Sequence, residues 1–179
     1  QLRSVQTEIF TQLNISDPSG SVTLNDKILI PGDNAVDFEF TYVDNKNNSY
    51  VNGKLSDYTG KKNVVIAFYP APYSLSCMME VKKFDSYAEK ETIQNIVNSN
   101  IGADENIEIL MVSNSGLGIL SKWKNDTKLN NVKLVSDLFG SISSSYSSFN
   151  PLGYNNRTLF IIDKSGKISY IDWNYAVDE

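Results

Sequence analysis

Apolar and polar residues follow one another along the chain in a pattern that predicts the short strands and helices of an α/β domain. Residues 64–68 and 107–112 are continuous apolar runs, which are typical of central strands covered on both faces. Residues 38–42 alternate between aromatic and polar side chains, so we expect a half-buried strand there. From residue 77 to residue 88 the apolar positions recur at helical spacing, and residues 93–97 extend the same stripe.

The second half of the chain predicts the elements that would complete a sheet. These are a helix that opens at residues 115–118, a short strand at 132–135, a Ser-rich helix at 138–146, and a closing hairpin of 158–162 and 167–173. The resulting order, β-β-β-α-β-α-β-α-β-β, implies a mixed central β-sheet flanked by helices on both faces.

The N-terminal region differs from the rest of the chain. Residues 1–20 hold one short amphipathic turn, which a stretch containing Pro18 and Gly20 interrupts, so we predict an N-terminal appendage. Residues 22–30 predict a β-hairpin. Since no domain boundary or repeat follows, we predict one domain over residues 21–179, a length that can bury a substantial core.

Composition excludes several classes of function. The chain has 41% hydrophobic and 21% charged residues and a net charge of −5, which is a poor basis for binding nucleic acid. No apolar run approaches the length that spans a membrane. The chain has no histidine and one cysteine, which excludes histidine metal sites, Ser-His or Cys-His catalysis and an internal disulfide. We therefore expect no metal and no cofactor.

The one cysteine, Cys77, is the strongest candidate for chemistry. It lies between a predicted buried strand and a predicted helix, where free N–H groups and the positive end of the helix dipole favour a thiolate. The alternative is that Cys77 is a small buried hydrophobe, which is the common role of a lone cysteine.

The residues around Cys77 resemble the active-site pattern of the peroxiredoxins. Pro70, Ser74 and Cys77 give P-x3-[T/S]-x2-C. Five other segments are also similar to the family, and they follow one another in the same order as in that family. They are residues 32–38 (G-D-N-A-V-D-F), 55–62, 68–70, 135–137 and 157–163 (R-T-L-F-I-I-D). The resemblance covers about Gly32 to Trp173. It implies a thioredoxin-like fold, and the N-terminal hairpin is similar to one in the thiol-peroxidase branch.

The resemblance also implies an enzyme that reduces hydrogen peroxide or organic hydroperoxides. The Cys77 thiolate would attack the peroxide and become a sulfenic acid, with Arg157 as the cation that reaches both the sulfur and the substrate. Ser74 would hydrogen bond the peroxide and the thiolate, or serve only as a helix N-cap. Pro70 would shield the thiolate, or only end the strand. Glu80 would orient Arg157, or only complement the helix dipole.

Three positions depart from the family pattern. Ser74 stands in place of Thr and keeps the hydroxyl without the methyl group, and Val36 stands in place of Pro. No second cysteine is present, so an external thiol must resolve the sulfenic acid. The resemblance therefore indicates a one-cysteine peroxiredoxin whose reductant is a thioredoxin-like protein, glutathione or another low-molecular-weight thiol. A homodimer is expected because dimers are common in the family.

Two other functions remain open at this point. Cys77 could serve a peroxide sensor or redox relay that passes oxidation to a partner protein, or the domain could be a non-catalytic thioredoxin-fold binding module. A disulfide oxidoreductase is disfavoured because Glu80 stands where a Cys-x-x-Cys motif needs its second cysteine. The chain begins with Gln1, so we expect a processed or recombinantly trimmed protein, either cytoplasmic or exported after signal-peptide removal.

Overall fold

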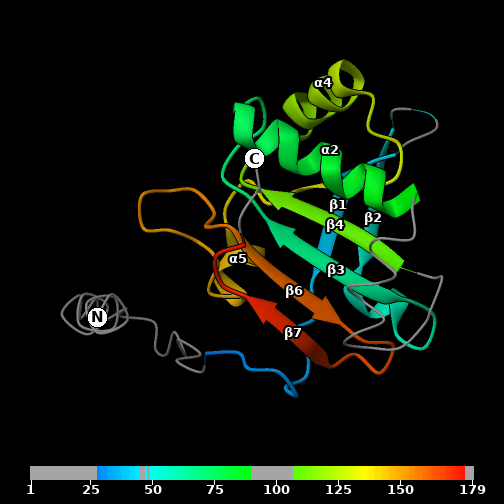
Figure 1. Cartoon of the computed structure of the whole chain (residues 1–179), viewed down its shortest axis with the longest axis vertical. Coiled ribbons are helices and arrows are strands. Elements are labelled where there is room, and N and C mark those ends of the chain that lie inside the picture. The colour runs from blue at the N-terminus through cyan, green and yellow to red at the C-terminus, as the bar shows by residue number, and fades with distance from the viewer. Residues whose placement is uncertain (1–27, 45–46, 48, 90–106, 176–179) are drawn as a thin grey trace, which may run out of the picture.

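A computed structural model describes residues 28–44, 47, 49–89 and 107–175, which form a seven-stranded sheet flanked by helices (Figure 1). The strands are β1 (Glu39–Val43), β2 (Tyr50–Lys54), β3 (Asn63–Phe68), β4 (Ile107–Ser113), β5 (Lys133–Ser136), β6 (Thr158–Ile162) and β7 (Ile168–Asp172). The helices are η1 (Leu55–Tyr58), α2 (Leu75–Glu89), α4 (Leu117–Thr127) and α5 (Ser141–Ser145). Among these described elements, no helix combines the length and apolarity that crossing a bilayer takes.

The sheet is mixed, as the sequence predicts. Its strand order is β2-β1-β5-β4-β3-β6-β7. The strands at its centre, β3 and β4, are the two apolar runs, and they pair in parallel, whereas β6 lies antiparallel on the other side of β3. Every residue of β3 is buried, because the sheet is covered on both faces at this point.

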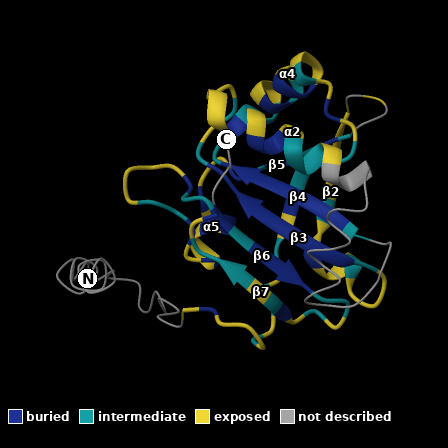
Figure 2. Ribbon diagram, in the orientation of Figure 1, coloured by how far each residue is buried: buried dark blue, intermediate teal, exposed yellow. Residues whose placement is uncertain are grey.

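Alternate residues of the central strands build two separate cores. Val65, Ala67 and the neighbouring positions on β4 contact α2 and α4. Val64, Ile66 and Phe68 point to the opposite face, where they pack with η1, α5 and aromatic residues of β1 and β6. Figure 2 shows the result, with β3 and β4 dark blue between helices whose outer surfaces are exposed. The site described below lies on the α2 and α4 face.

The edge strand β2 was missed by the sequence analysis. Its residues alternate between exposed and half-buried, and they include Tyr50, which is exposed, and Gly53, which lies against the ring of Phe40. An edge strand pairs through its backbone on one side and needs little apolar side-chain surface, so the hydrophobic pattern is weak there. Within the described residues, and apart from the short helix η1, the elements follow the predicted order β-β-β-α-β-α-β-α-β-β, with β2 as the second strand.

Three predicted segments lie outside the described residues. They are the N-terminal appendage, most of the hairpin at 22–30, and the residues at 93–97 that were expected to extend the apolar face of the helix after Cys77. Residues 28–30 are described, and they lie outside every strand of the sheet. From there, Gly32 donates to the carbonyl of Ile168 at 2.7 Å, and Ala35 donates to that of Gly166 at 2.9 Å. This segment therefore runs beside the β6–β7 hairpin.

The Ser-rich helix is shorter than predicted. It spans Ser141–Ser145 instead of residues 138–146 because the buried carboxylate of Asp137 fixes its start. Asp137 accepts hydrogen bonds from the backbone N–H of Ile142 at 3.0 Å and of Ser143 at 2.8 Å. These N–H groups belong to the first turn of α5 and would otherwise be unpaired. Residues 138 and 139 consequently lie in an exposed loop.

We expect the substitution Asp137→Asn to destabilise the fold. The amide group turns one acceptor into a donor opposite buried N–H groups, which should lower the free energy of unfolding by about 2 kcal/mol. Urea unfolding followed by circular dichroism measures the change. Glu39→Gln, at an exposed carboxylate on β1, is the control and should leave the midpoint unchanged. Equal midpoints for both variants would show that Asp137 does not fix the start of α5.

Candidate active site

Cys77 lies in the first turn of α2, close to the end of β3. It is fully buried within the core cluster that α2 and α4 form with the sheet. Ser74 precedes the helix, and its Oγ accepts a hydrogen bond from the backbone N–H of Cys77 at 3.2 Å. That contact is an N-cap, so the helix-start role considered for Ser74 is present in the structure. It also places the Ser74 hydroxyl within one turn of the thiol.

Arg157 reaches Cys77 because of how β6 pairs with β3. Thr158, the first residue of β6, lies opposite Phe68, the last residue of β3. Arg157 therefore stands at the same end of the sheet as the start of α2. Its Nη2 donates to Cys77 Sγ at 3.1 Å and to Ser76 Oγ at 3.0 Å. The structure thus brings together the predicted cation and the predicted nucleophile, which are 80 residues apart in sequence.

Glu80 lies one helical turn after Cys77 and forms an ion pair with Arg157 through Nη1 and Oε2. Its side chain is 2% exposed, so the carboxylate is within the protein and not on a solvated first turn. Of the two roles considered from sequence, the structure shows contact with Arg157. The guanidinium is therefore shared, with one nitrogen on the carboxylate and the other on the sulfur.

Tyr175 was missed by the sequence analysis and completes the buried group. Its hydroxyl donates to Glu80 Oε1 and lies 3.1 Å from the carbonyl oxygen of Phe68. The predicted closing hairpin was the feature of the sequence that could have indicated its position. Asp172 on β7 lies opposite Leu159 on β6, so the residues after β7 return to the end of the sheet where Arg157 lies. Burial raises the pKa of Tyr175 well above its usual range, which keeps the phenol protonated and able to donate.

Pro70 is half-buried in the loop between β3 and α2, two residues beyond the end of β3. Further along this loop, Tyr73 has a left-handed backbone with φ of 64°, an unusual conformation for a residue with a bulky side chain. The Tyr73 hydroxyl donates to Asp126 on α4 at 2.8 Å. Helix α4 therefore supports the backbone turn that carries Ser74.

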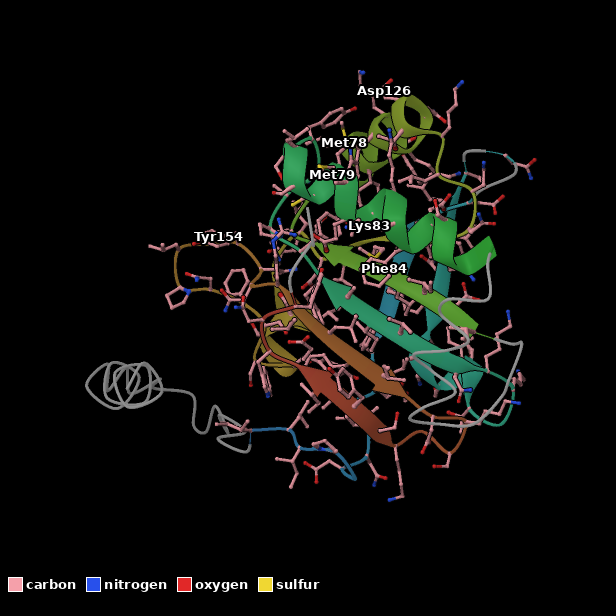
Figure 3. The ribbon with its side chains drawn as sticks, in the orientation of Figure 1. Met78, Met79, Lys83, Phe84, Asp126 and Tyr154 are labelled. Atoms are coloured by element: carbon pink, nitrogen blue, oxygen red, sulfur yellow. The ribbon has the colours of Figure 1, made fainter. Side chains whose placement is uncertain are left out.

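The surface around the site is partly apolar. Met79 on α2 and Tyr154 on the loop before β6 are both exposed, whereas Met78 and Phe84 are half-buried against the core (Figure 3).

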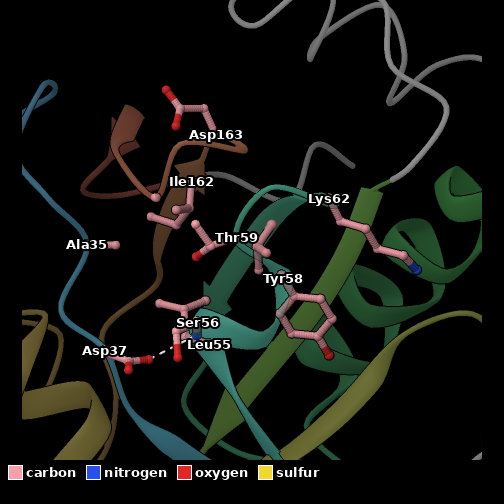
Figure 4. Close-up of a pocket in the computed structure, with 11 residues that line it drawn as sticks. Ala35, Asp37, Leu55, Ser56, Tyr58, Thr59, Lys62, Ile162 and Asp163 are labelled. Atoms are coloured by element: carbon pink, nitrogen blue, oxygen red, sulfur yellow. Dashed lines mark hydrogen bonds between the residues drawn. The ribbon is translucent and has the colours of Figure 1, made fainter.

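A separate pocket lies at the opposite end of β3 and is lined by eleven residues, among them Tyr58, Lys62 and Asp163 (Figure 4). In it, the Asp37 carboxylate accepts a hydrogen bond from the backbone N–H of Ser56 at 2.9 Å. Its lining includes none of the residues around Cys77. Within the part of the chain that the structure describes, no three His, Cys, Asp or Glu side chains are grouped as a metal site requires.

Comparison with known proteins gives consistent results. The AhpC/TSA family model matches residues 31–171. The chloroplastic 2-Cys peroxiredoxin BAS1 of Spinacia oleracea is 33% identical over an alignment of 153 residues, and the match covers 81% of this chain and 52% of that protein. Peroxiredoxin-2 of Mus musculus is 32% identical over an alignment of 149 residues, and the match covers 80% of this chain and 69% of that protein. The chain thus spans about half the length of the plant relative.

Solved structures show the same fold. The mitochondrial 2-Cys peroxiredoxin of Plasmodium falciparum superimposes with a TM-score of 0.66 and 28% identity, covering 82% of this chain and 83% of that one. The reduced 2-Cys peroxiredoxin of Plasmodium vivax gives a TM-score of 0.68 at 23% identity, covering 80% and 72%. These matches confirm the thioredoxin-like fold that the sequence resemblance implies.

We expect alkaline pH to unfold the protein. Burial raises the pKa of Tyr69, Tyr146 and Tyr175 above the ordinary value of 10.0. These tyrosines lose their protons at a lower pH in the unfolded chain than in the folded one. The free energy of unfolding therefore keeps its full value below pH 10 and falls as the pH rises above it. Tyrosinate absorbance should show that these three tyrosines ionise at a higher pH than the others, and circular dichroism should show that the protein unfolds at the same pH. Ionisation of all ten tyrosines near pH 10 without unfolding would contradict this.

Proposed function

Because the chain belongs to the AhpC/TSA family, we propose that it is a thiol-dependent peroxidase whose nucleophile is Cys77. The Cys77 thiolate attacks one oxygen of a hydroperoxide, an S–O bond forms, and the O–O bond breaks. The other oxygen leaves with the bonding electron pair and takes a proton to become water or an alcohol. Sulfur is oxidised to a sulfenic acid while the peroxide is reduced.

The observation that carries this proposal is the contact between Arg157 Nη2 and Cys77 Sγ at 3.1 Å. A thiol that served only as a small apolar side chain would need no guanidinium within hydrogen-bond distance of its sulfur. In the proposed reaction the guanidinium lies beside the sulfur and stabilises the negative charge that develops on the leaving oxygen. This contact also weighs against a non-catalytic binding module.

Ser74 and Pro70 have supporting roles in the proposal. The Ser74 hydroxyl caps α2 at the N–H of Cys77 and can turn its own hydrogen toward a bound peroxide oxygen. Pro70 limits the conformations of the loop between β3 and α2, and its proposed role is to shield the sulfur from water. Because Cys77 is fully buried, the substrate must be small or the loop at residues 70–76 must open to admit it.

An external thiol completes the proposed cycle. The sulfenic acid condenses with that thiol to a mixed disulfide and water, and a second external thiol reduces the disulfide and restores Cys77. Cys77 is the only cysteine in these 179 residues, so the chain has no second thiol that could condense with the sulfenic acid. A thioredoxin-like protein, glutathione or another low-molecular-weight thiol would supply the electrons.

We also propose that residues 21–179 act as one domain and that the protein forms a homodimer. The domain proposal is supported by the sheet, whose strands from β1 to β7 join residues 39–172 in one hydrogen-bonded unit. The dimer proposal is supported by exposed apolar side chains such as Leu75 and Leu152, at 73% and 79% exposure.

Removing Arg157 should slow oxidation of Cys77 by peroxide. In Arg157→Ala we expect the second-order rate constant with hydrogen peroxide to fall by about 100-fold or more, as for loss of a donor that stabilises transition-state charge. Stopped-flow fluorescence can follow the reaction because Trp123 lies in the same core cluster as Cys77. Lys167→Ala, an exposed cation beyond β6, is the control. Similar rates for wild type and Arg157→Ala would refute the proposed role.

The oxidised product should be a sulfenic acid that external thiols reduce. One equivalent of peroxide should add one oxygen atom to the intact mass, a dimedone adduct should map to Cys77, and thiol added before dimedone should abolish the adduct. Excess peroxide without thiol should add further oxygen atoms. Cys77→Ser, which keeps a polar atom of similar size, should show none of these changes. Equal modification of Cys77→Ser would place the oxidation elsewhere, on methionine for example.

A further inference from the structure

Tyr175 contacts Glu80, the carboxylate that is paired with Arg157, and the proposed reaction gives Tyr175 no part. We infer that Tyr175 is a positioning residue for this reaction, since its hydroxyl occupies one oxygen of Glu80 and so leaves one nitrogen of Arg157 available to Cys77. This inference rests on the proposed peroxidase function. It adds the segment after β7 to the parts of the chain that determine how fast Cys77 reacts.

The first step in the argument is the geometry around Glu80. Its Oε2 is paired with Arg157 Nη1, and its Oε1 accepts from the Tyr175 hydroxyl. Both oxygens of the buried carboxylate are therefore occupied by different partners. Arg157 Nη2 points instead to Cys77 Sγ and Ser76 Oγ, at 3.1 and 3.0 Å.

The second step is the pairing that arginine and carboxylate groups otherwise prefer. Two parallel N–H···O bonds, one from each terminal nitrogen, form the common and strong bidentate arrangement. If Glu80 Oε1 lost its donor, a buried acceptor would be left unpaired, which costs free energy until another donor is found. Arg157 Nη2 belongs to the guanidinium that already pairs with Oε2, and it would have to leave Cys77 in order to supply that donor.

The third step is that Tyr175 is held firmly enough to act in this way. It is 8% exposed, and its ring packs edge-on against Phe84 of α2 at a centroid distance of 6.0 Å. Its hydroxyl also lies 3.1 Å from the carbonyl oxygen of Phe68, at the end of β3. The phenol is thus fixed between the strand and the helix that carry the site. The substitution Tyr175→Phe removes the hydroxyl and keeps this packing.

The test compares oxidation rates of Tyr175→Phe and of a matched control. Tyr146→Phe also removes a buried hydroxyl, which donates to the carbonyl of Val36 at 2.7 Å on the other face of the sheet. We expect Tyr175→Phe to lower the second-order rate constant with hydrogen peroxide by about tenfold, as for one hydrogen bond to a charged group, and Tyr146→Phe to leave it unchanged. Urea unfolding of each variant corrects for the folded fraction.

A double-mutant cycle separates positioning from loss of structure. If Tyr175 acts through Arg157, Tyr175→Phe should have no further effect on the rate in an Arg157→Ala background. The same loss in both backgrounds, or no loss in Tyr175→Phe alone, would overturn the inference while leaving the peroxidase function intact. A wild-type rate no faster than that of a free thiol would overturn the proposed function, and this inference with it.

Discussion

The guanidinium of Arg157 is the one group on which the candidate site depends. It is paired with the buried carboxylate of Glu80 through one nitrogen and with the sulfur of Cys77 through the other. A buried carboxylate needs a positive charge nearby, and in this site the side chain that supplies it also donates to the sulfur of Cys77. The other contacts of the site help to hold the guanidinium between these two groups. Ser74 caps the first turn of α2, Ser76 accepts a hydrogen bond from Arg157, and Tyr175 donates to the other oxygen of Glu80.

The fold provides this position through three elements that end at the same place. Strand β3 ends at Phe68, β6 begins opposite it, and the chain after β7 returns to the same end of the sheet. Helix α2 then starts above the junction and lays Cys77 and Glu80, one turn apart, against it. Since β3 is buried on both faces, its end is fixed by two cores. The reactive group is therefore placed by a strand that is packed on both faces.

Much of this arrangement could be predicted from the sequence, and the failures have physical reasons. The central strands and α2 carry strong apolar patterns, and the spacing of Pro70, Ser74 and Cys77 resembles a known family, so these features and the pairing of Arg157 with Cys77 were expected. Strand β2 was missed because an edge strand needs few apolar residues, and α5 was drawn too long because a single carboxylate, Asp137, sets its start. Tyr175 was missed because its role depends on the register of β6 and β7, which local pattern does not show.

The central claim is that Arg157 makes Cys77 reactive toward peroxides in particular, and not merely toward any electrophile. The most direct test is to compare the second-order rate constants of the wild-type protein with hydrogen peroxide and with iodoacetamide, each divided by the value for a free low-molecular-weight thiol. Our account predicts a far larger acceleration with peroxide, because only a peroxide places a leaving oxygen where the guanidinium can stabilise its charge. Equal acceleration with both reagents would show a thiol that is reactive in general and has no specific help for peroxides, and no acceleration with either would leave Cys77 a buried apolar residue.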